Sequence, residues 1–213
     1  MKKNRKHNRR SILEKVGTVS SIGLVGTAGV GKVAGEDETN LSKKEKAKAD
    51  QVIKIVNRDD ISEKAKKQRL KKYDRKIIEY AIFPHSFTVS TESGNSSDSV
   101  GTAAVSENMT TTVTNTSKRG NDLWQLTLKT WWDYTGTDIE SVSWDVSTDT
   151  WNGWSTVSTN VTDSTTENYD GGIGSWTVNG TGTFENSLNQ QSCEITHVMY
   201  DHGDSDRTSC ADP

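Results

Sequence analysis

The chain has 213 residues, a formal net charge of −3 and only 31% hydrophobic residues. No stretch of about 20 predominantly apolar residues is present, which argues against a stable membrane anchor. The near-neutral total conceals a division, because residues 41–80 carry 14 Lys and Arg against 7 Asp and Glu, whereas residues 81–213 carry 4 against 18. The sequence therefore has a basic first part and an acidic second part, which meet near Pro84.

The first 35 residues have the pattern of an export signal. A basic head ends in the adjacent pair Arg9 and Arg10, and the uncharged residues 16–30 that follow are only mildly hydrophobic because four of them are glycine. This segment is too short and too rich in glycine to span a membrane, so we expect it to be cleaved. The small residues Ala34 and Gly35 mark the expected cleavage zone.

This leader resembles the twin-arginine leaders of secreted proteins, especially those of halophilic archaea. The resemblance covers residues 1–35 and rests on Arg9, Arg10 and the mildly hydrophobic, glycine-rich stretch after them. It implies that the twin-arginine export machinery carries an already folded protein out of the cytoplasm, and hence a secreted, extracellular location. It implies nothing about activity.

Residues 36–84 are predicted to form a basic helical hairpin. Ala49, Val52 and Val56 follow the spacing of one helical face, and residues 57–60 interrupt it. Asp60 and Glu63 have the spacing of a capping box, which predicts a second helix that ends before Pro84. The apolar stripe of this second helix consists of Leu70, Tyr73, Ile77 and Ala81.

Three interpretations of the basic segment stay open. The simplest is a solvated basic surface, and the second is a pro-region or docking hairpin that lies against the acidic part of the same chain. The third is binding to nucleic acid or to an anionic membrane surface. Nucleic acid is disfavoured because no aromatic side chains for base stacking are interleaved with the lysines.

Residues 85–213 are predicted to form an antiparallel β-sandwich or a barrel-like domain. The clearest signal is alternation of apolar and polar residues from Trp124 to Tyr134, and Val142, Trp144 and Val146 repeat it. Turn residues separate the remaining short segments of high β-propensity. Further strands are expected around residues 87–90, 100–106, 110–114, 157–161, 176–178 and 193–199, and turns at Gly94-Asn95, Gly120-Asn121, Asn152-Gly153, Asp170-Gly171-Gly172 and Asn179-Gly180.

The C-terminal region suggests a disulfide and a weak metal candidate. Cys193 and Cys210 are the only cysteines, and in an exported chain an isolated pair most simply forms one disulfide. His197 is expected to point into the core. The acidic tail offers weak candidate ligands for calcium or zinc, but a solvated loop is the preferred interpretation and no cofactor is expected. These candidates are Asp201, His202, Asp204 and Asp206.

Three tryptophans are candidate ligand-binding residues. Six of the seven tryptophans fall between Trp124 and Trp154, and most are expected in the core. Trp131 shares a strand face with polar residues, so it should point away from the core. Trp151 and Trp154 flank the predicted Asn152-Gly153 turn. Exposed aromatic rings beside polar side chains can stack on sugars. Two other interpretations of Trp131 stay open, namely that it packs beneath the helical hairpin or against a partner.

These features favour a secreted, non-enzymatic β-sandwich protein that binds a glycan, an envelope component or a protein partner. A second hypothesis is an antimicrobial or toxin-like protein released from a precursor by a cut near residue 84. A third is a glycan-acting hydrolase, for which the sequence offers abundant acids but neither a Gly-x-Ser-x-Gly elbow nor a His-Glu-x-x-His helix.

Overall fold

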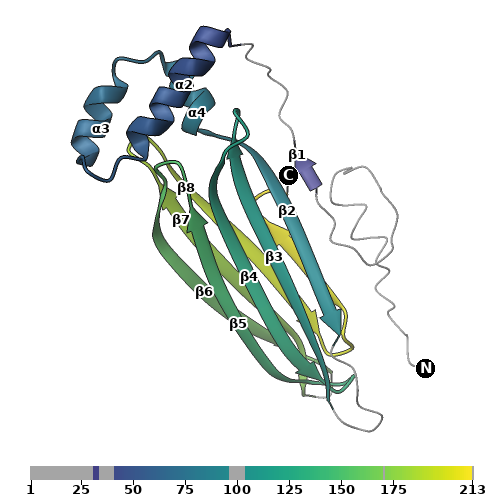
Figure 1. Ribbon diagram of the computed structural model, residues 1–213. Coiled ribbons are helices and arrows are strands. Elements are labelled where there is room, and N and C mark those ends of the chain that lie inside the picture. Colours follow the sequence, from purple (N-terminus) through teal and green to yellow (C-terminus); the bar gives the residue numbers. More distant parts are fainter. Residues whose placement is uncertain (1–30, 34–40, 96–103, 170, 213) are drawn as a thin grey trace.

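Three short helices cap one end of a long, two-sheet antiparallel β-sandwich in the computed structural model (Figure 1). The structure describes residues 31–33, 41–95, 104–169 and 171–212. The predicted fold class, a mainly β protein with an antiparallel sandwich after basic helices, is confirmed. The leader residues Arg9, Arg10, Ala34 and Gly35 lie outside the described residues.

The basic segment forms three helices rather than the two that were predicted. The long second helix is interrupted at residues 71–74, where the Tyr73 N–H bonds to the Leu70 carbonyl and closes a turn. The Asp74 carboxylate then accepts a hydrogen bond of 3.0 Å from the Lys76 N–H and starts a new helix. The three helices are α2 (Lys43–Val56), α3 (Glu63–Leu70) and α4 (Arg75–Ile82).

The predicted capping box at Asp60 and Glu63 is wrong. Ser62 caps α3, and its hydroxyl accepts a hydrogen bond from the Ala65 N–H. Asp60 is not available for capping because its carboxylate binds the Arg58 guanidinium, which lowers the pKa of Asp60 to about 2. A complete capping box does occur one helix earlier, at the start of α2.

The capping box of α2 consists of Ser42 and Glu45. The Ser42 N–H donates to the Glu45 carboxylate over 2.8 Å, and the Glu45 N–H donates to the Ser42 hydroxyl over 3.3 Å. Lys76 of α4 binds the same carboxylate, 2.6 Å away, and with Ser42 it lowers the pKa of Glu45 to about 2. This contact ties α4 to the first turn of α2.

The helices, which we call the helical cap (residues 42–83), share a small core of their own. Their lysines and arginines lie mainly on the outer faces, so the apolar stripe predicted from the sequence is the face that packs. The side chains of this core are Ala49, Val52, Val56, Leu70, Ile77, Ala81 and Ile82. None of the helices in the described residues is long and apolar enough to cross a membrane.

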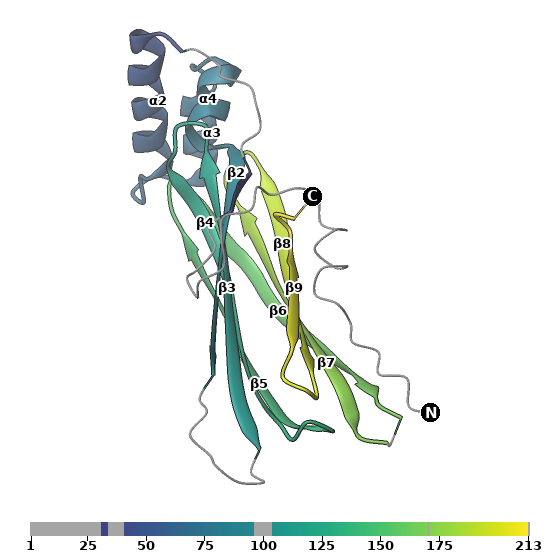
Figure 2. The ribbon, with the colours of Figure 1, turned by 90° about the vertical axis from the view of Figure 1, so that its right-hand side faces the viewer.

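The sandwich consists of two sheets, and within each sheet consecutive strands pair antiparallel; β5 and β6 are consecutive in the sequence but belong to different sheets. The first sheet contains β1 (Gly31–Val33), β2 (Pro84–Asn95), β3 (Val105–Ser117), β4 (Asp122–Tyr134) and β5 (Ile139–Thr150). The second contains β6 (Ser155–Glu167), β7 (Ile173–Glu185), β8 (Gln190–Tyr200) and β9 (Ser205–Ser209). Figure 2 shows the two sheets side-on.

Strand β4 supplies the centre of the sandwich core. Its alternation is confirmed, because Trp124, Leu126, Leu128 and Trp132 are all 2% exposed or less. The Trp124 indole stacks on the Phe184 ring of the opposite sheet, with ring centroids 4.4 Å apart. Aromatic burial of this kind supplies much of the apolar area that a small sandwich requires.

Two glycines of β7 make room for β4. A Cβ at Gly180 would lie 3.1 Å from the Leu128 side chain, and one at Gly182 would lie 3.0 Å from Leu126 and 2.8 Å from the Phe184 ring. The predicted turn at Asn179-Gly180 is therefore wrong, because the glycine serves close sheet packing inside a strand. The predicted turn at Gly94-Asn95 is also wrong, since both residues belong to β2.

A polar contact joins the two sheets inside the core. His197 of β8 is fully buried, as predicted, and its Nδ1 and Nε2 lie 3.0 Å from Thr130 Oγ1 and 2.9 Å from Thr111 Oγ1. Burial, together with the nearby Arg207 guanidinium, lowers the pKa of His197 to about 4. The imidazole is thus neutral at pH 7, and it donates to one hydroxyl and accepts from the other.

The C-terminal tail is attached to β8 by the predicted disulfide. Cys193 and Cys210 are bonded, and Cys193 is only 1% exposed. The Cys210 N–H also donates to the Glu194 carbonyl over 2.8 Å. Residues 205–209 form β9, so the tail lies on the sheet as a short edge strand.

Candidate binding site between the helical cap and the sandwich

A tight turn at residues 151–154 carries the chain from one sheet to the other. Asn152 and Gly153 both have positive φ, 54° and 78°, and the Trp154 N–H donates to the Trp151 carbonyl over 3.1 Å. These are the features of a type I′ turn, for which Asn-Gly is the favoured sequence. The predicted turn is confirmed, but the strands that it joins, β5 and β6, belong to different sheets.

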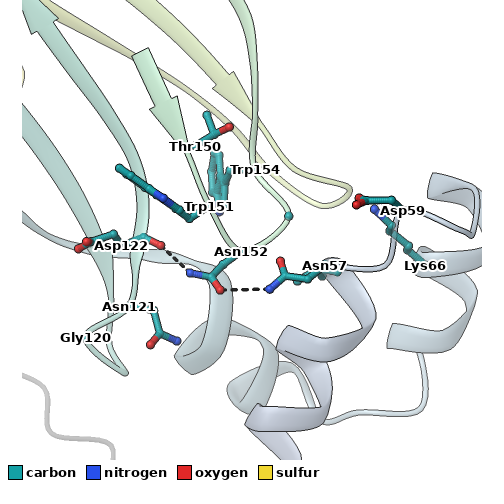
Figure 3. A pocket seen from close by; sticks show the side chains of 12 residues that line it. Asn57, Asp59, Lys66, Gly120, Asn121, Asp122, Thr150, Trp151, Asn152 and Trp154 are labelled. Atoms are coloured by element: carbon teal, nitrogen blue, oxygen red, sulfur yellow. Dashed lines mark hydrogen bonds between the residues drawn. The ribbon is translucent and has the colours of Figure 1, made fainter. Parts of the chain in front are cut away.

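The same turn packs against the helical cap. A Cβ at Gly153 would lie 2.5 Å from the Val56 Cβ, so only glycine permits this approach at the end of α2. The Asn152 side chain bridges the two parts: its Oδ1 accepts from Asn57 over 3.4 Å, and its Nδ2 donates to the Asp122 carbonyl over 2.7 Å (Figure 3).

Trp154 anchors the cap and does not present its ring to solvent. It is 5% exposed, and its Nε1 donates a hydrogen bond of 3.1 Å to the Ile82 carbonyl at the end of α4. The Asn186 side chain donates to the same carbonyl over 3.4 Å. The prediction that Trp154 belongs to a ligand-binding pair is therefore not supported by its position; Trp151 alone of the two has an exposed indole.

The turn between β3 and β4 makes the third contact with the cap. The Arg119 N–H donates to the Tyr80 carbonyl over 3.2 Å, and its guanidinium pairs with Asp50 of α2. Gly120 has a positive φ of 86°, which fits its place after Arg119 in a tight hairpin. The loops at this end of the sandwich therefore hold the cap in a defined orientation.

Between these contacts lies an open recess of about 670 Å³, which we call the junction recess. Residues of α2 and α3 and of the connection between them form one wall, and the β3–β4 and β5–β6 turns form the other (Figure 3). Its lining residues are Val56, Asn57, Asp59, Lys66, Gly120, Asn121, Asp122, Thr150, Trp151, Asn152, Gly153 and Trp154.

The junction recess combines one exposed indole with side-chain amides and charges. Trp151 is 39% exposed, and its main-chain N–H is held by the Leu123 carbonyl over 2.9 Å. Asn57, Asn121 and Asp122 line the same recess, and their amide and carboxylate groups can exchange hydrogen bonds with a ligand. A flat apolar ring next to planar polar groups is chemically suited to a ligand that is apolar on one face and hydroxylated at its edges.

Trp131 lies at a different place in the fold. It is 43% exposed on the outer face of the first sheet, as predicted, where it faces Asn108 and Ser143 on the neighbouring strands. It borders a smaller recess of about 230 Å³ with Asp133, whose pKa is lowered by hydrogen bonds from Ser106 and Ser141. The structure therefore does not bring Trp131 and Trp151 into one site.

The acidic tail residues are engaged with one another at the end of the sandwich away from the cap. His202 Nδ1 lies 2.9 Å from Asp201 and its Nε2 lies 3.4 Å from Asp204, whereas Asp206 accepts a hydrogen bond from the Tyr200 hydroxyl. Across the part of the chain that the structure describes, no group of three or more His, Cys, Asp or Glu residues is arranged to hold a metal ion.

Several recess residues could not be found from the sequence. Asn57 and Asp59 are about 60 or more positions away from Asn121 and Asp122, and no local pattern indicates that α2 ends beside the sandwich loops. The only sequence feature that indicated contact between the two parts of the chain was their opposite net charge, because opposite charges favour docking. That signal does not specify which end of the sandwich receives the cap.

These features define a helix-capped antiparallel β-sandwich with an aromatic, polar recess at the junction. No protein-family model, no curated protein and no solved structure matches the chain.

Proposed function

We propose that the protein is an exported, non-enzymatic carbohydrate-binding protein that holds its ligand in the junction recess. The observation that carries this proposal is the exposed indole of Trp151 at the edge of a recess that also holds Asn57, Asn121 and Asp122. A sugar ring has an apolar C–H face and polar edges, so it can stack on the indole while its hydroxyls bond to the amides and the carboxylate.

The open form of the recess favours a polymer or a chain end over a small enclosed ligand. The recess has about 670 Å³ and is bounded by two walls, so more than one sugar unit can lie across it. Asp59 and Asp122 contribute negative charge and Lys66 contributes positive charge. A neutral or mixed-charge glycan of a cell envelope or matrix suits this lining better than a strongly anionic one.

In this proposal the helical cap is part of the binding protein and not a removable pro-region. Asn57, Asp59 and Lys66 come from the cap, and Asn121, Trp151 and Asn152 come from the sandwich. Ile82, which precedes the expected precursor cut near residue 84, is fully buried, and its carbonyl accepts two hydrogen bonds. These contacts support retention of the cap in the mature protein.

Two observations support export. The leader has the residues of a twin-arginine signal, and the disulfide between Cys193 and Cys210 is a bond that persists in oxidising compartments. Intact-mass measurement of protein from the culture medium tests both export and maturation. We expect one species that begins near residue 36, and that therefore lacks the short strand β1 (Gly31–Val33), with both cysteines oxidised. A secreted species that begins near residue 84 would support the precursor hypothesis instead.

Carbohydrate binding is tested first on a glycan array and then by calorimetry with the best ligand. We expect Trp151→Ala to weaken binding about tenfold or more, because it removes the stacking surface. Trp131→Ala is the matched control, since this residue is similarly exposed but lies on another face. The proposal fails if no glycan binds, or if Trp151→Ala binds as tightly as the unaltered protein.

Incubation with the bound glycan distinguishes a binding protein from a hydrolase. Both ring nitrogens of His197 lie within hydrogen-bond distance of threonine hydroxyls, and this supports a structural role for the one buried imidazole among the described residues. We expect the ligand to be recovered intact after prolonged incubation, as measured by mass spectrometry. Cleavage that is lost on replacement of a single Asp or Glu would establish the hydrolase instead.

A further inference from the structure

Strand β6 has one edge that no other strand of the described residues covers. In the second sheet β6 pairs with β7 and ends the sheet, so its other row of main-chain N–H and C=O groups has no strand partner. Figure 1 shows β6 along the outer side of the sandwich. The pairing with β7 is regular over nine consecutive residues, from Ser158 to Thr166, so the free edge is long and has no register shift over this stretch.

Both faces of β6 are open as well. Twelve of its 13 residues are exposed, and only Val161 is partly covered. In an ordinary sandwich the inward face of an edge strand is covered by the other sheet. Here the first sheet leaves β6 uncovered, and Val157 is 49% exposed.

The sequence of β6 lacks the residues that usually protect such an edge. Proteins prevent edge-to-edge pairing with lysine, proline, bulges or very short strands. β6 holds no Lys, Arg, Pro or Gly, and its two register irregularities lie near its ends. By contrast β9, which ends the same sheet on the other side, has only five residues and includes Arg207. Seven of its 13 residues are threonine or valine, which favour strand formation.

The charges of β6 are arranged so that the strand complements itself. Its only two charged residues, Asp163 and Glu167, lie in its second half. In an antiparallel pair of two copies centred near Val161, Asp163 would face Thr159 and Glu167 would face Ser155, so no two carboxylates are opposed. Parallel pairing in register would place each carboxylate beside its copy.

We propose that β6 is a homodimer interface, in which two copies of the chain pair their β6 edges antiparallel about a two-fold axis and form one continuous eight-stranded sheet. This interface is independent of the junction recess and of any carbohydrate. An isologous contact of this kind closes on itself, so assembly stops at the dimer. The added hydrogen bonds satisfy main-chain groups that water otherwise solvates.

Sedimentation equilibrium of the full mature chain measures the association directly. We expect a concentration-dependent monomer–dimer equilibrium with no higher species. Dimer formation should strengthen as salt is raised, because residues 81–213 carry excess negative charge that repels between copies and is screened by salt. A contact between the basic cap and an acidic surface of another copy would weaken with salt, so the sign of the salt effect separates the two arrangements.

A pair of proline variants tests the edge itself. In an antiparallel ladder the N–H groups of adjacent residues point to opposite edges, so Asn160→Pro and Val161→Pro remove one donor on each side of β6. We expect one variant to lose thermal stability through the β6–β7 ladder. The other should keep its stability and raise the dimer dissociation constant about tenfold or more, since the symmetry removes two hydrogen bonds per dimer.

A cysteine cross-link tests the register. Val161→Cys places thiols near the two-fold axis, and Ser155→Cys is the control, because residue 155 of one copy lies far from residue 155 of the other in the antiparallel pair. We expect a covalent dimer with the first variant and none with the second. A chain that is monomeric at all concentrations and salt levels overturns the proposal, as do a dimer unaffected by either proline and equal cross-linking of both cysteine variants.

Discussion

The indole N–H of Trp154 donates a hydrogen bond to the main-chain carbonyl of Ile82, and this bond fastens the end of α4 to the turn between the two sheets. Trp154 is almost fully buried, so the bond is sheltered from water. The position of the cap, and with it the shape of the junction recess, depends on this contact.

Replacing Trp154 with Phe removes the donor and leaves the Ile82 carbonyl with only the longer bond from Asn186. We expect Trp154→Phe to lower the free energy of unfolding by about 1–3 kcal/mol, the cost of an unsatisfied buried group. Urea unfolding followed by circular dichroism measures this loss. Trp151→Phe is the control and should change the free energy by less than about 0.5 kcal/mol; equal effects of the two variants would contradict the anchoring role.

Stability should fall as the pH decreases from about 6.5 to about 4, because the buried His197 resists protonation. Its pKa is about 4 in the folded chain against an ordinary value of 6.5. The unfolded chain therefore binds a proton in this window that the folded chain does not, and the loss amounts to about 3 kcal/mol. The pKa values of Glu45 and Asp60 are lowered to about 2 from ordinary values of 4.5 and 3.8, so their stabilising effect is lost only as the pH falls below about 5, at the acidic end of this window.

Unfolding free energies measured from pH 4 to pH 7 test this. His197→Gln should flatten the curve between about pH 5 and pH 7, because it removes the buried imidazole. A curve for His197→Gln that keeps the full slope of the unaltered protein would show that other groups cause the pH dependence.

A methyl group at Gly182 should be poorly tolerated. The added Cβ would lie 2.8 Å from the Phe184 ring and 3.0 Å from Leu126, inside the packed core. We expect Gly182→Ala to cost about 1–3 kcal/mol, the usual penalty for overpacking. Gly94→Ala is the control, because an added Cβ would come no closer than 3.2 Å to its nearest neighbour, the terminal amide of the Asn108 side chain. Differential scanning calorimetry should show a lower melting temperature for the first variant alone.

Removal of the disulfide should destabilise the sandwich without changing its fold. Cys193 and Cys210 are 17 positions apart, and closing a loop of this size contributes about 3 kcal/mol through the lost freedom of the unfolded chain. We expect the double variant Cys193→Ser with Cys210→Ser, and the reduced protein, to show the same loss in denaturant unfolding. Unchanged midpoints for both would refute a stabilising role.

Strands could be predicted from the sequence where the opposite sheet covers one whole face of the strand, because such strands alternate apolar and polar residues. Trp124, Leu126 and Leu128 alternate with polar residues because β4 is central and one of its faces lies against the second sheet. β5 and β6 are edge strands with less cover, so Trp144 and Val157 are exposed although their sequence pattern resembles that of β4. Alternation identifies a strand, but it does not reveal how far the opposite sheet extends.

Turns and caps were less predictable because one residue type serves several purposes. Asn152-Gly153 is a turn, whereas Asn179-Gly180 lies within β7, where the glycine accommodates Leu128 from 52 positions away in the sequence. Asp60 had the spacing of an N-cap, but Arg58 binds it. For the candidate site, the exposure of Trp131 and Trp151 followed from strand parity and turn chemistry. The burial of Trp154 depends on α4, which no local pattern places there.

The pairing of each strand with its sequence neighbours has a consequence for how the chain reaches its native state. Only short segments must be closed to form each hairpin, so the entropic barrier is small compared with that of a Greek-key topology of the same size. The connection from β5 to β6, which joins the two sheets, is the two-residue turn Asn152-Gly153. This sequence favours the type I′ turn even without tertiary contacts. We therefore expect the chain to fold rapidly, which would suit the proposed export of an already folded protein.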